Sequence, residues 1–448
     1  MKIEFNFKYS RQFLGIFIVF MGSPLIFFFK EVVGLGGTSI FTIGSLILGM
    51  IIMISPDDIF KKFYKPNLPI FRLAAIFIII SLLNFLFVNP FYGYSANRYV
   101  FTRDLGNYIF IFSFFFLLLG VSNNVKDYFL PIVVVLTFFG SICLIYSMAT
   151  NPYFIIGQRA SVVFGDGSTT ASGNPHVYAR NAFAGIFSSY LMLRAKNMLW
   201  KIFAIANMIL STVVLVLTQA RSILLAFFFA LAIFAYYNIS VKSITSTVKG
   251  LFKPQNLVLI TLIIAGVMYF ISTQARLMGI INLYYDTVSV TLTKALLTAT
   301  GQTQSSKDID YSAMGRVNSF NEFKKILFEK PWQLLLGNGY HFLYMDIPVL
   351  EAWVDCGIIA FWSFAMMNWM IFKESLRAIK QNTNPLTIFL GYFYMSYFVG
   401  IFTGGEPYGT AYWFIFCVMI RFLGIKYLER KLTPVPKQVP NISPTVSV

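Results

Sequence analysis

The sequence predicts an all-α protein that crosses a membrane about twelve times and keeps both termini on the cytoplasmic side. Composition is the first reason: 57% of the 448 residues are hydrophobic and only 12% are charged, whereas soluble domains carry about 25% charged residues. The second reason is that long apolar runs recur along the chain. The third is that lysine and arginine concentrate in alternate connecting segments.

Continuous apolar runs occur at twelve places, each long enough with its flanks for a spanning helix of about 20 residues. They cover residues 14–29, 40–54, 70–88, 109–121, 129–148, 177–193, 202–217, 223–237, 257–271, 349–372, 388–402 and 411–424. Continuous rather than alternating runs favour helices, because lipid leaves no backbone hydrogen-bonding group unpaired. No small-residue cleavage site follows the first run, so we expect a retained helix there.

These runs divide the chain into four parts. Residues 1–272 hold nine predicted helices, residues 273–347 form one long loop, and residues 348–428 hold three further helices. Residues 429–448 form a polar, proline-containing tail that we expect to be disordered. Within the loop, residues 317–329 predict an amphipathic helix on the bilayer surface, whose lysines meet lipid headgroups or solvent.

The basic residues set the orientation. With the amino terminus inside, most of the 35 lysine and arginine residues fall in cytoplasmic segments, which is the positive-inside pattern. The loop 273–347 then faces the outer side. Basic residues in cytoplasmic segments account for most of the positive charge, so the formal net charge of +17 does not indicate nucleic-acid binding. We expect no nucleic acid as a partner. Three cysteines lie inside predicted spans and provide neither a disulfide framework nor a metal-binding spacing: Cys143, Cys356 and Cys417.

Several arginines remain on the outer side, at or near predicted helix ends. Arg221 opens an apolar run, Arg316 lies in the long loop, and Arg180 shares a helix face with His176 one turn earlier. A charge at a membrane end is costly unless it reaches the interface or serves a function. Arginine pairs two N–H groups with phosphate oxygens, so these three arginines predict a diphosphate site. Four other outward arginines are interpreted as interfacial residues: Arg98, Arg103, Arg159 and Arg276.

Three segments carry a resemblance to a known family. Residues 218–222 (Thr-Gln-Ala-Arg-Ser) open an apolar helix, and Gly315-Arg316 precedes the amphipathic segment, Pro331 and Gly337-Asn338-Gly339. Residues 346–350 (Asp-Ile-Pro-Val-Leu) then lead to residues 355–359 (Asp-Cys-Gly-Ile-Ile) at the entry of a span. In this order and on one side of the membrane, over roughly residues 174–372, the combination resembles the O-antigen polymerase and O-antigen ligase superfamily.

The resemblance implies a membrane glycosyltransferase with a multi-helix, GT-C-like fold that uses no nucleotide sugar, metal or other cofactor. Such enzymes transfer an oligosaccharide from undecaprenyl diphosphate on the periplasmic side of the bacterial inner membrane. The implied partners are a lipid-linked donor, a lipid-linked acceptor, membrane lipid and a protein that regulates chain length. Ligases of this superfamily carry a histidine at the position of Asp346, so the acid here favours a polymerase.

Transfer to a sugar hydroxyl needs a group that accepts its proton. Asp346 is the first candidate and His341 the second, and His341 keeps a ligase in consideration. Asp346 also suits the N-cap of the following helix. Direct displacement by the acceptor predicts inversion at the anomeric carbon. Three further residues are possible members of the site: His176, Glu406 and Tyr340.

Two other functions stay open from the sequence. A ligase would share the scaffold and transfer the glycan to lipid A, a protein or a cell-wall acceptor. A lipid-linked oligosaccharide flippase would also need many helices and basic residues. Transporters, however, place ionisable groups near the middle of the bilayer, whereas the predicted spans here are nearly free of charge at their centres.

Overall fold

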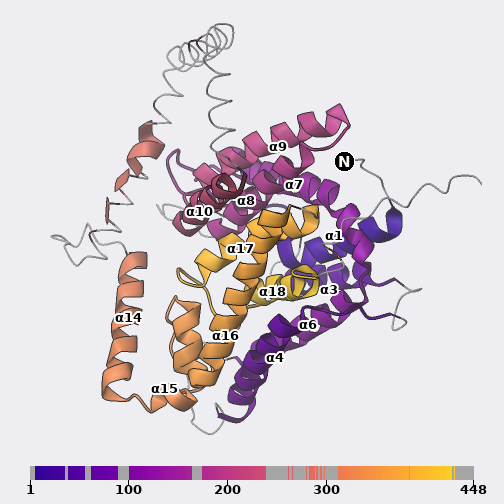
Figure 1. The fold of residues 1–448 in the computed structure, drawn as a ribbon. Helices are drawn as coiled ribbons and strands as arrows, with labels where there is room; N and C mark the ends of the chain where they lie inside the picture. The colour runs from indigo at the N-terminus through magenta and orange to yellow at the C-terminus, as the bar shows by residue number, and fades with distance from the viewer. Residues whose placement is uncertain are drawn as a thin grey trace, which may run out of the picture.

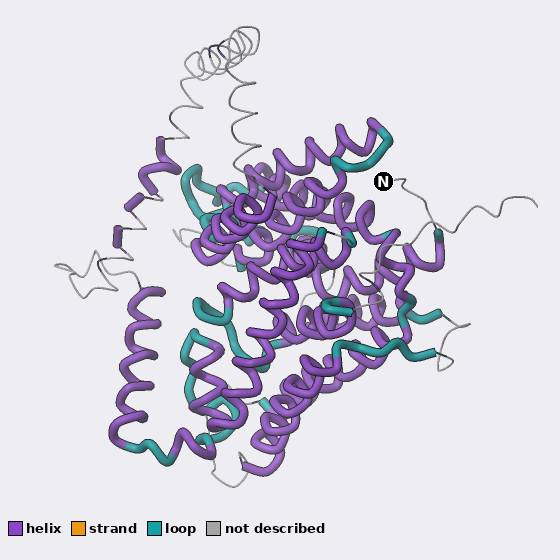
Figure 2. Tube along the Cα trace, viewed as in Figure 1, coloured by secondary structure: helices purple, strands orange, loops and turns teal. Residues whose placement is uncertain are grey.

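The computed structural model describes residues 6–35, 39–55, 62–88, 100–163, 174–238, 311–382, 384–425 and 428, with short pieces between 261 and 297. All regular elements in these residues are helices, which confirms the all-α prediction (Figure 2). The predicted run 257–271 lies almost entirely outside the described residues. The tail 429–448 and most of the segment 273–310 lie outside them as well.

The helices follow the predicted runs closely (Figure 1). In chain order they are α1 (Phe7–Met21), α2 (Ser23–Glu31), α3 (Ser39–Met53), α4 (Leu68–Leu83), η1 (Asn84–Val88), α6 (Phe101–Gly120), η2 (Asn123–Asp127), α7 (Phe129–Thr150), α8 (Pro175–Met192), α9 (Met198–Leu217), α10 (Arg221–Asn238), α14 (Tyr311–Glu329), α15 (Gln333–Leu336), α16 (Pro348–Gln381), α17 (Pro385–Gly400) and α18 (Thr410–Phe422). Helix α6 begins eight residues before its apolar run, so Arg103 and Asp104 are helical.

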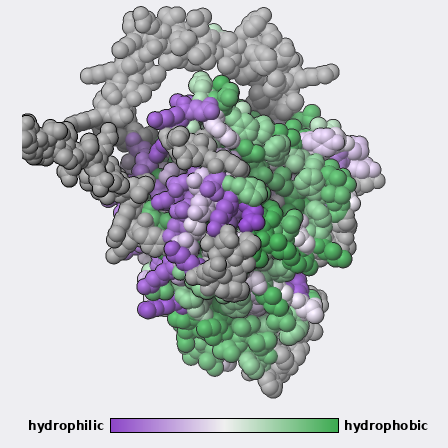
Figure 3. Space-filling view, turned by 90° about the vertical axis from the view of Figure 1, so that its right-hand side faces the viewer, coloured by the Kyte–Doolittle hydropathy of each residue, from purple (hydrophilic) through white to green (hydrophobic). Residues whose placement is uncertain are grey.

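The molecule has the composition and surface of a polytopic membrane protein. Among the described residues, six helices are long and apolar enough to cross a membrane, or seven if the bent pair α1 and α2 forms one span. Large apolar side chains such as Ile79, Phe112 and Phe116 are exposed, as expected of a surface that faces lipid. Figure 3 shows a wide hydrophobic surface beside a smaller hydrophilic group. The count of twelve spans stays a prediction.

The first apolar run is not one straight helix. Residues 14–29 are divided at Gly22, where α1 and α2 meet at a bend of 70°. Pro24 has no N–H to donate to the carbonyl four residues earlier, which interrupts the helix at this point. Tyr178 of α8 donates to the carbonyl of Pro24 at 2.7 Å, so the bend is joined to the bundle.

Contacts between helix termini gather at two ends of the bundle. At one end, the N–H of Asn67 donates to the carbonyl of Ile420 at 2.8 Å, and the buried Arg421 donates to the carbonyl of Leu118 at 3.0 Å. These contacts join the start of α4, the end of α18 and the end of α6. At the other end, the start of α6 meets the loop before α16. The order of the membrane crossings, and which end faces the cytoplasm, stay predictions.

Helix α16 is broken near its start. Gly357 adopts φ +80°, and the break frees the carbonyls of Val354 and Asp355 from their helical partners. The N–H groups of Asn338 and Gly339 donate to these carbonyls at 3.0 and 2.9 Å. The loop between α15 and α16 is therefore fixed to the break in α16, and this loop carries three of the predicted site residues, Tyr340, His341 and Asp346.

The predicted amphipathic helix is part of α14, which stands beside the bundle and joins it through α15 (Figure 1). Its apolar side chains Phe323, Ile326 and Leu327 pack into a small cluster with Met345 and Val354. This packing brings the opposite end of the same helix, with Arg316, to the loop before α16. The position of α14 on a bilayer surface stays a prediction.

Candidate functional site: an arginine cluster beside a carboxylate

Four arginines converge on one histidine. Arg180 comes from α8, Arg221 from α10, Arg316 from α14 and Arg159 from the segment between α7 and α8. Burial, and after it the positive charges of all four arginines, lowers the pKa of His176 from 6.5 to about 3. We call these four residues the arginine cluster. It contains all three arginines that the sequence predicted for a diphosphate.

His176 stands in the first turn of α8, before the predicted span 177–193. Asn174 caps this helix, because its Oδ1 accepts from the N–H of His176 at 3.0 Å. On the imidazole ring, Nε2 lies 3.3 Å from Nη2 of Arg159, and Nδ1 lies 3.3 Å from Oγ of Ser222. Both ring nitrogens therefore contact segments other than α8.

The segment that carries Arg159 is fixed to the turn between α9 and α10. Arg159 Nε donates to the carbonyl of Thr218 at 3.1 Å, and the N–H of Ala160 donates to the carbonyl of Leu217 at 2.9 Å. Gln219, which adopts φ +48°, donates from its side chain to the carbonyl of Gly157 at 3.0 Å. Residues 218–222 thus contribute Arg221 to the arginine cluster and also hold Arg159 in place.

Arg180 is held against aromatic rings. Its guanidinium carbon lies 4.4 Å from the ring centre of Tyr397 and 5.9 Å from that of Tyr412. Tyr412 donates to the carbonyl of Gly404 at 2.6 Å and interacts electrostatically with Asp346. The rings of α17 and α18 therefore connect the arginine cluster to the predicted base.

Asp346 lies at the edge of this cluster. Its Oδ2 is 3.3 Å from Nε of Arg316, and its Oδ1 accepts from the hydroxyl of Tyr344 at 3.0 Å. The Asp346 side chain is 25% exposed and that of Arg316 is 35% exposed, so a ligand can reach both. The N-cap interpretation of Asp346 is wrong: the N-cap of α16 is Ile347, without a side-chain hydrogen bond. Asp346 points to the arginine instead.

A second group surrounds His341, which we call the carboxylate cluster: Asp104, His341, Glu351, Asp355 and Glu406. His341 Nε2 lies 4.0 Å from Oδ1 of Asp104, and both side chains are almost fully buried. Arg103 Nε donates to the same oxygen of Asp104 at 2.9 Å. Glu406 interacts electrostatically with Arg103 and with Tyr340, whose ring packs on His341 at 4.3 Å. His341, Tyr340 and Glu406 therefore belong to this group.

Two further acids of the carboxylate cluster hold the loop that carries Asp346. Asp355 and Glu351 come from α16 and are fully buried. The N–H of Leu343 donates to Oδ1 of Asp355 at 3.3 Å, and the N–H of Met345 donates to Oε2 of Glu351 at 3.1 Å. Asp346, at φ +54°, follows directly. A non-glycine residue in this region is unfavourable by itself, so neighbouring contacts stabilise it.

Two of the arginines interpreted as interfacial have partners inside the protein. Arg159 belongs to the arginine cluster, and Arg103, whose side chain is 51% exposed, pairs with the buried Asp104. Their interfacial position stays a prediction. Arg98 and Arg276 lie outside the described residues. Sequence reasoning also missed Asp104, Ser222 and Tyr344. The available signals were weak: an acid beside an arginine at a helix start, and a tyrosine two residues before an acid.

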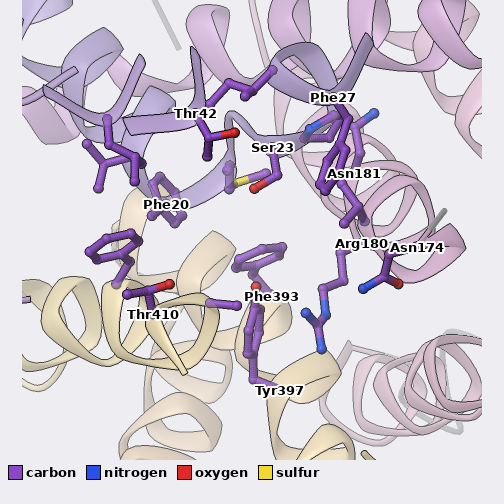
Figure 4. A pocket seen from close by; sticks show the side chains of 18 residues that line it. Phe20, Ser23, Phe27, Thr42, Asn174, Arg180, Asn181, Phe393, Tyr397 and Thr410 are labelled. Carbon is purple, nitrogen blue, oxygen red and sulfur yellow. The ribbon is translucent and has the colours of Figure 1, made fainter. Parts of the chain in front are cut away.

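An apolar cavity of about 190 Å³ lies beside Arg180. It is bounded by the bend between α1 and α2 and by α3, α8, α17 and α18, and its walls include Phe20, Phe27 and Phe393 (Figure 4). Figure 4 shows the guanidinium of Arg180 at the cavity edge near Tyr397. One end of this cavity is therefore cationic and the rest is largely apolar.

Within the described residues, histidine, cysteine and acidic side chains form no group of three that could hold a metal ion. No protein-family model matches the chain, and no curated protein matches it.

Proposed function

We propose that this chain is a membrane glycosyltransferase that transfers an oligosaccharide from undecaprenyl diphosphate to a sugar hydroxyl of a second lipid-linked unit, which makes it a polysaccharide polymerase. One observation carries the proposal. Four arginines from four segments converge beside a partly exposed, ion-paired carboxylate, Asp346. Arginines fit a diphosphate leaving group, and a carboxylate fits the proton of an acceptor hydroxyl.

The arginine cluster suits the donor. A lipid diphosphate gathers negative charge as the glycosidic bond breaks, and fixed guanidinium groups stabilise that charge without reorganising. The aromatic rings on Arg180 and the ion pair of Arg316 hold two of these groups in place. The apolar cavity beside Arg180 suits the first carbons of a lipid chain that leaves the diphosphate.

Asp346 suits the acceptor side. In the proposed reaction a sugar hydroxyl attacks the anomeric carbon, its proton passes to the Asp346 carboxylate, and the lipid diphosphate departs. A single displacement of this kind inverts the anomeric centre. Tyr344 and Arg316 each engage one carboxylate oxygen and fix its direction. Each oxygen keeps a lone pair for the proton.

Two observations favour this function over its alternatives. His341, the residue that kept a ligase in consideration, is buried against Asp104 and is not accessible to an acceptor. The arginines lie at helix starts, as Arg180 and Arg221 show, and not at helix centres, where transporters place their charged groups. Both support transfer chemistry at one end of the bundle.

The test is to incubate the purified protein with a lipid-diphosphate-linked oligosaccharide and to separate the products on a gel. We expect a ladder of growing lipid-linked glycans that is lost in Arg316→Ala. Arg377→Ala is the matched control, because Arg377 is an exposed arginine near the end of α16 that is paired with Glu374. Movement of labelled substrate across a liposome bilayer without a ladder would make the protein a transporter. Transfer to lipid A alone would make it a ligase.

A further inference from the structure

His176 joins three segments of the proposed diphosphate site. It belongs to α8, its Nε2 faces Arg159 from the segment after α7, and its Nδ1 faces Ser222 in α10. Each contact is 3.3 Å long. These contacts determine which ring nitrogen carries the proton, because one partner can only donate a hydrogen bond and the other can donate or accept one.

Arginine can only donate hydrogen bonds, so the Nε2 that faces Arg159 must be an acceptor without a proton. In a neutral imidazole the proton is then on Nδ1. Nδ1 therefore donates to Oγ of Ser222. A hydroxyl that accepts from the ring directs its own hydrogen elsewhere. Ser222 adjoins Arg221, so this hydrogen is available to an anion held by the arginine cluster.

The charges around the ring keep it neutral. Four guanidinium groups face it from four segments: Arg159, Arg180 on its own helix, Arg221 of α10 and Arg316 of α14. A fifth positive charge would be repelled, and burial adds a further cost. Burial and these charges hold the pKa of His176 near 3, far below the range in which a base works at neutral pH.

A neutral acceptor suits this position better than a charged one. A carboxylate here would pair with the arginines and compete with the diphosphate for them. An apolar side chain would leave Arg159 without the contact that fixes its terminal nitrogen. The imidazole holds the guanidinium and leaves its charge available to a ligand.

We propose that His176 is a positioning residue of the diphosphate site, which as a neutral imidazole fixes Arg159 and Ser222 as two further donors to the diphosphate. The proposal deepens the function proposed above and rests on it for the identity of the ligand. It assigns Arg159 a direct role in binding, and it gives His176, a possible member of the site, a role other than that of a base.

The test is the affinity of the full-length protein in detergent for farnesyl diphosphate, measured by titration calorimetry. We expect His176→Asn to weaken binding about tenfold, as for loss of a charge-assisted contact, because the short amide does not reach Arg159. His176→Gln should recover part of the loss, since its longer amide can accept from Arg159. The matched control, Arg377→Gln, should bind as the wild type does.

Two measurements separate positioning from a merely structural role. First, the losses in His176→Asn and Arg159→Gln should add up to less than their sum in the double variant, because part of the His176 effect acts through Arg159. Second, the ratio of wild-type to His176→Asn affinity should stay constant between about pH 5.5 and 8, on either side of the usual histidine pKa of about 6.5. A ratio that changes across this range, or additive losses, would overturn the proposal.

The outcomes distinguish this proposal from the proposed function. Binding of farnesyl diphosphate that depends on His176, without a glycan ladder, overturns the polymerase and leaves the positioning role standing. Wild-type protein that binds no diphosphate overturns both. If His176→Asn does not fold, Ser222→Ala replaces it: we expect about threefold weaker binding, for loss of a neutral hydrogen bond. Unchanged affinity in that variant would overturn the donor role of Ser222.

Discussion

The two histidines of this chain lie in opposite electrostatic surroundings. His176 faces four guanidinium groups, whereas His341 faces the carboxylate of Asp104. The regions also differ in access. Arg316 of the arginine cluster and Asp346 beside it are 35% and 25% exposed, but His341 and Asp104 are 3% and 1% exposed. The arginine cluster is thus open to a ligand, while the centre of the carboxylate cluster is closed.

This difference shows that the type of a residue at the end of a membrane helix does not by itself determine its function. Each cluster contains side chains that a mechanism could use as acid, base or anion donor. In the arginine cluster the charges have one sign and converge, which favours binding of an opposite charge from outside. In the carboxylate cluster acids meet a histidine, Arg103 and loop N–H groups, so their hydrogen bonds are used inside the protein. In the function we propose, the arginine cluster binds the ligand and the carboxylate cluster supports the loop beside it.

The largest effect should come from Asp346, the carboxylate at the edge of the arginine cluster. Asp346→Asn removes the proton acceptor but keeps the shape, so we expect transfer to fall by about 10² to 10⁴. Donor affinity should change much less, because the arginines remain. The ladder assay and calorimetry measure the two quantities separately. Asp286→Asn, an exposed acid in the described piece 282–287, is the control. Equal activity in Asp346→Asn would leave the carboxylate without a catalytic role.

The next prediction tests whether the guanidinium groups of the arginine cluster bind phosphate oxygens through paired N–H groups. Arg221→Lys and Arg316→Lys keep the charge but lose the paired N–H groups that match phosphate oxygens. We expect transfer efficiency to fall about 10- to 100-fold in each, since a bidentate contact contributes about 1.5 to 3 kcal/mol. Near-normal activity in both lysine variants would show that charge alone is sufficient and would contradict the bidentate argument.

The carboxylate cluster should respond in stability rather than in chemistry. Asp104→Asn removes the buried carboxylate that accepts from Arg103 Nε at 2.9 Å and faces the buried His341, and a hydrogen bond to a charged group contributes about 1.5 to 3 kcal/mol. We expect a clear fall in the unfolding temperature in detergent. Glu322→Gln, on the exposed side of α14, should leave that temperature unchanged. If Asp104→Asn lowered activity at unchanged stability, the cluster would be part of the reaction.

A smaller effect should appear in the pH dependence of folding stability, as the part that arises from His176. Its folded pKa of about 3 lies below its ordinary value of 6.5. Between these two pH values His176 binds a proton in the unfolded chain but not in the folded protein. The stability of the folded protein therefore falls as the pH falls below about 6.5. Above that pH the group contributes nothing to the dependence. His176→Asn should flatten the curve of unfolding temperature against pH, and an unchanged slope would contradict the buried, neutral imidazole.

The smallest effect concerns the glycine of the Gly315-Arg316 motif. Gly315 lies inside α14, and an added Cβ would meet no atom within 4 Å. Gly315→Ala should therefore stabilise the helix by about 0.5 to 1 kcal/mol and leave transfer unchanged. Gly337→Ala is the contrasting variant, because Gly337 has φ +86° and its added Cβ would strike the backbone of Asp355. Activity lost in Gly315→Ala would mean that a ligand approaches the helix there.

By itself, the sequence determined the helical class, the positions of most helices and the three arginines of the predicted diphosphate site. These features are local: an apolar run has to be helical in lipid, and a charge at its end is costly wherever the helix packs. The bend at Gly22 and the break at Gly357 were also locally encoded, by Pro24 and by a glycine, but their geometry was not.

Only the tertiary structure decided which charges meet. Arg159 joins His176, and His176 joins Ser222, across 17 and 46 positions of the chain. The same holds for His341, which is buried by Asp104 of α6, and for Asp346, which points to Arg316 instead of capping α16. Such contacts depend on how helices pack and where loops are fixed, so composition and spacing along the chain do not specify them. An arginine at a helix end can meet lipid, a carboxylate or a ligand, and packing selects among the three.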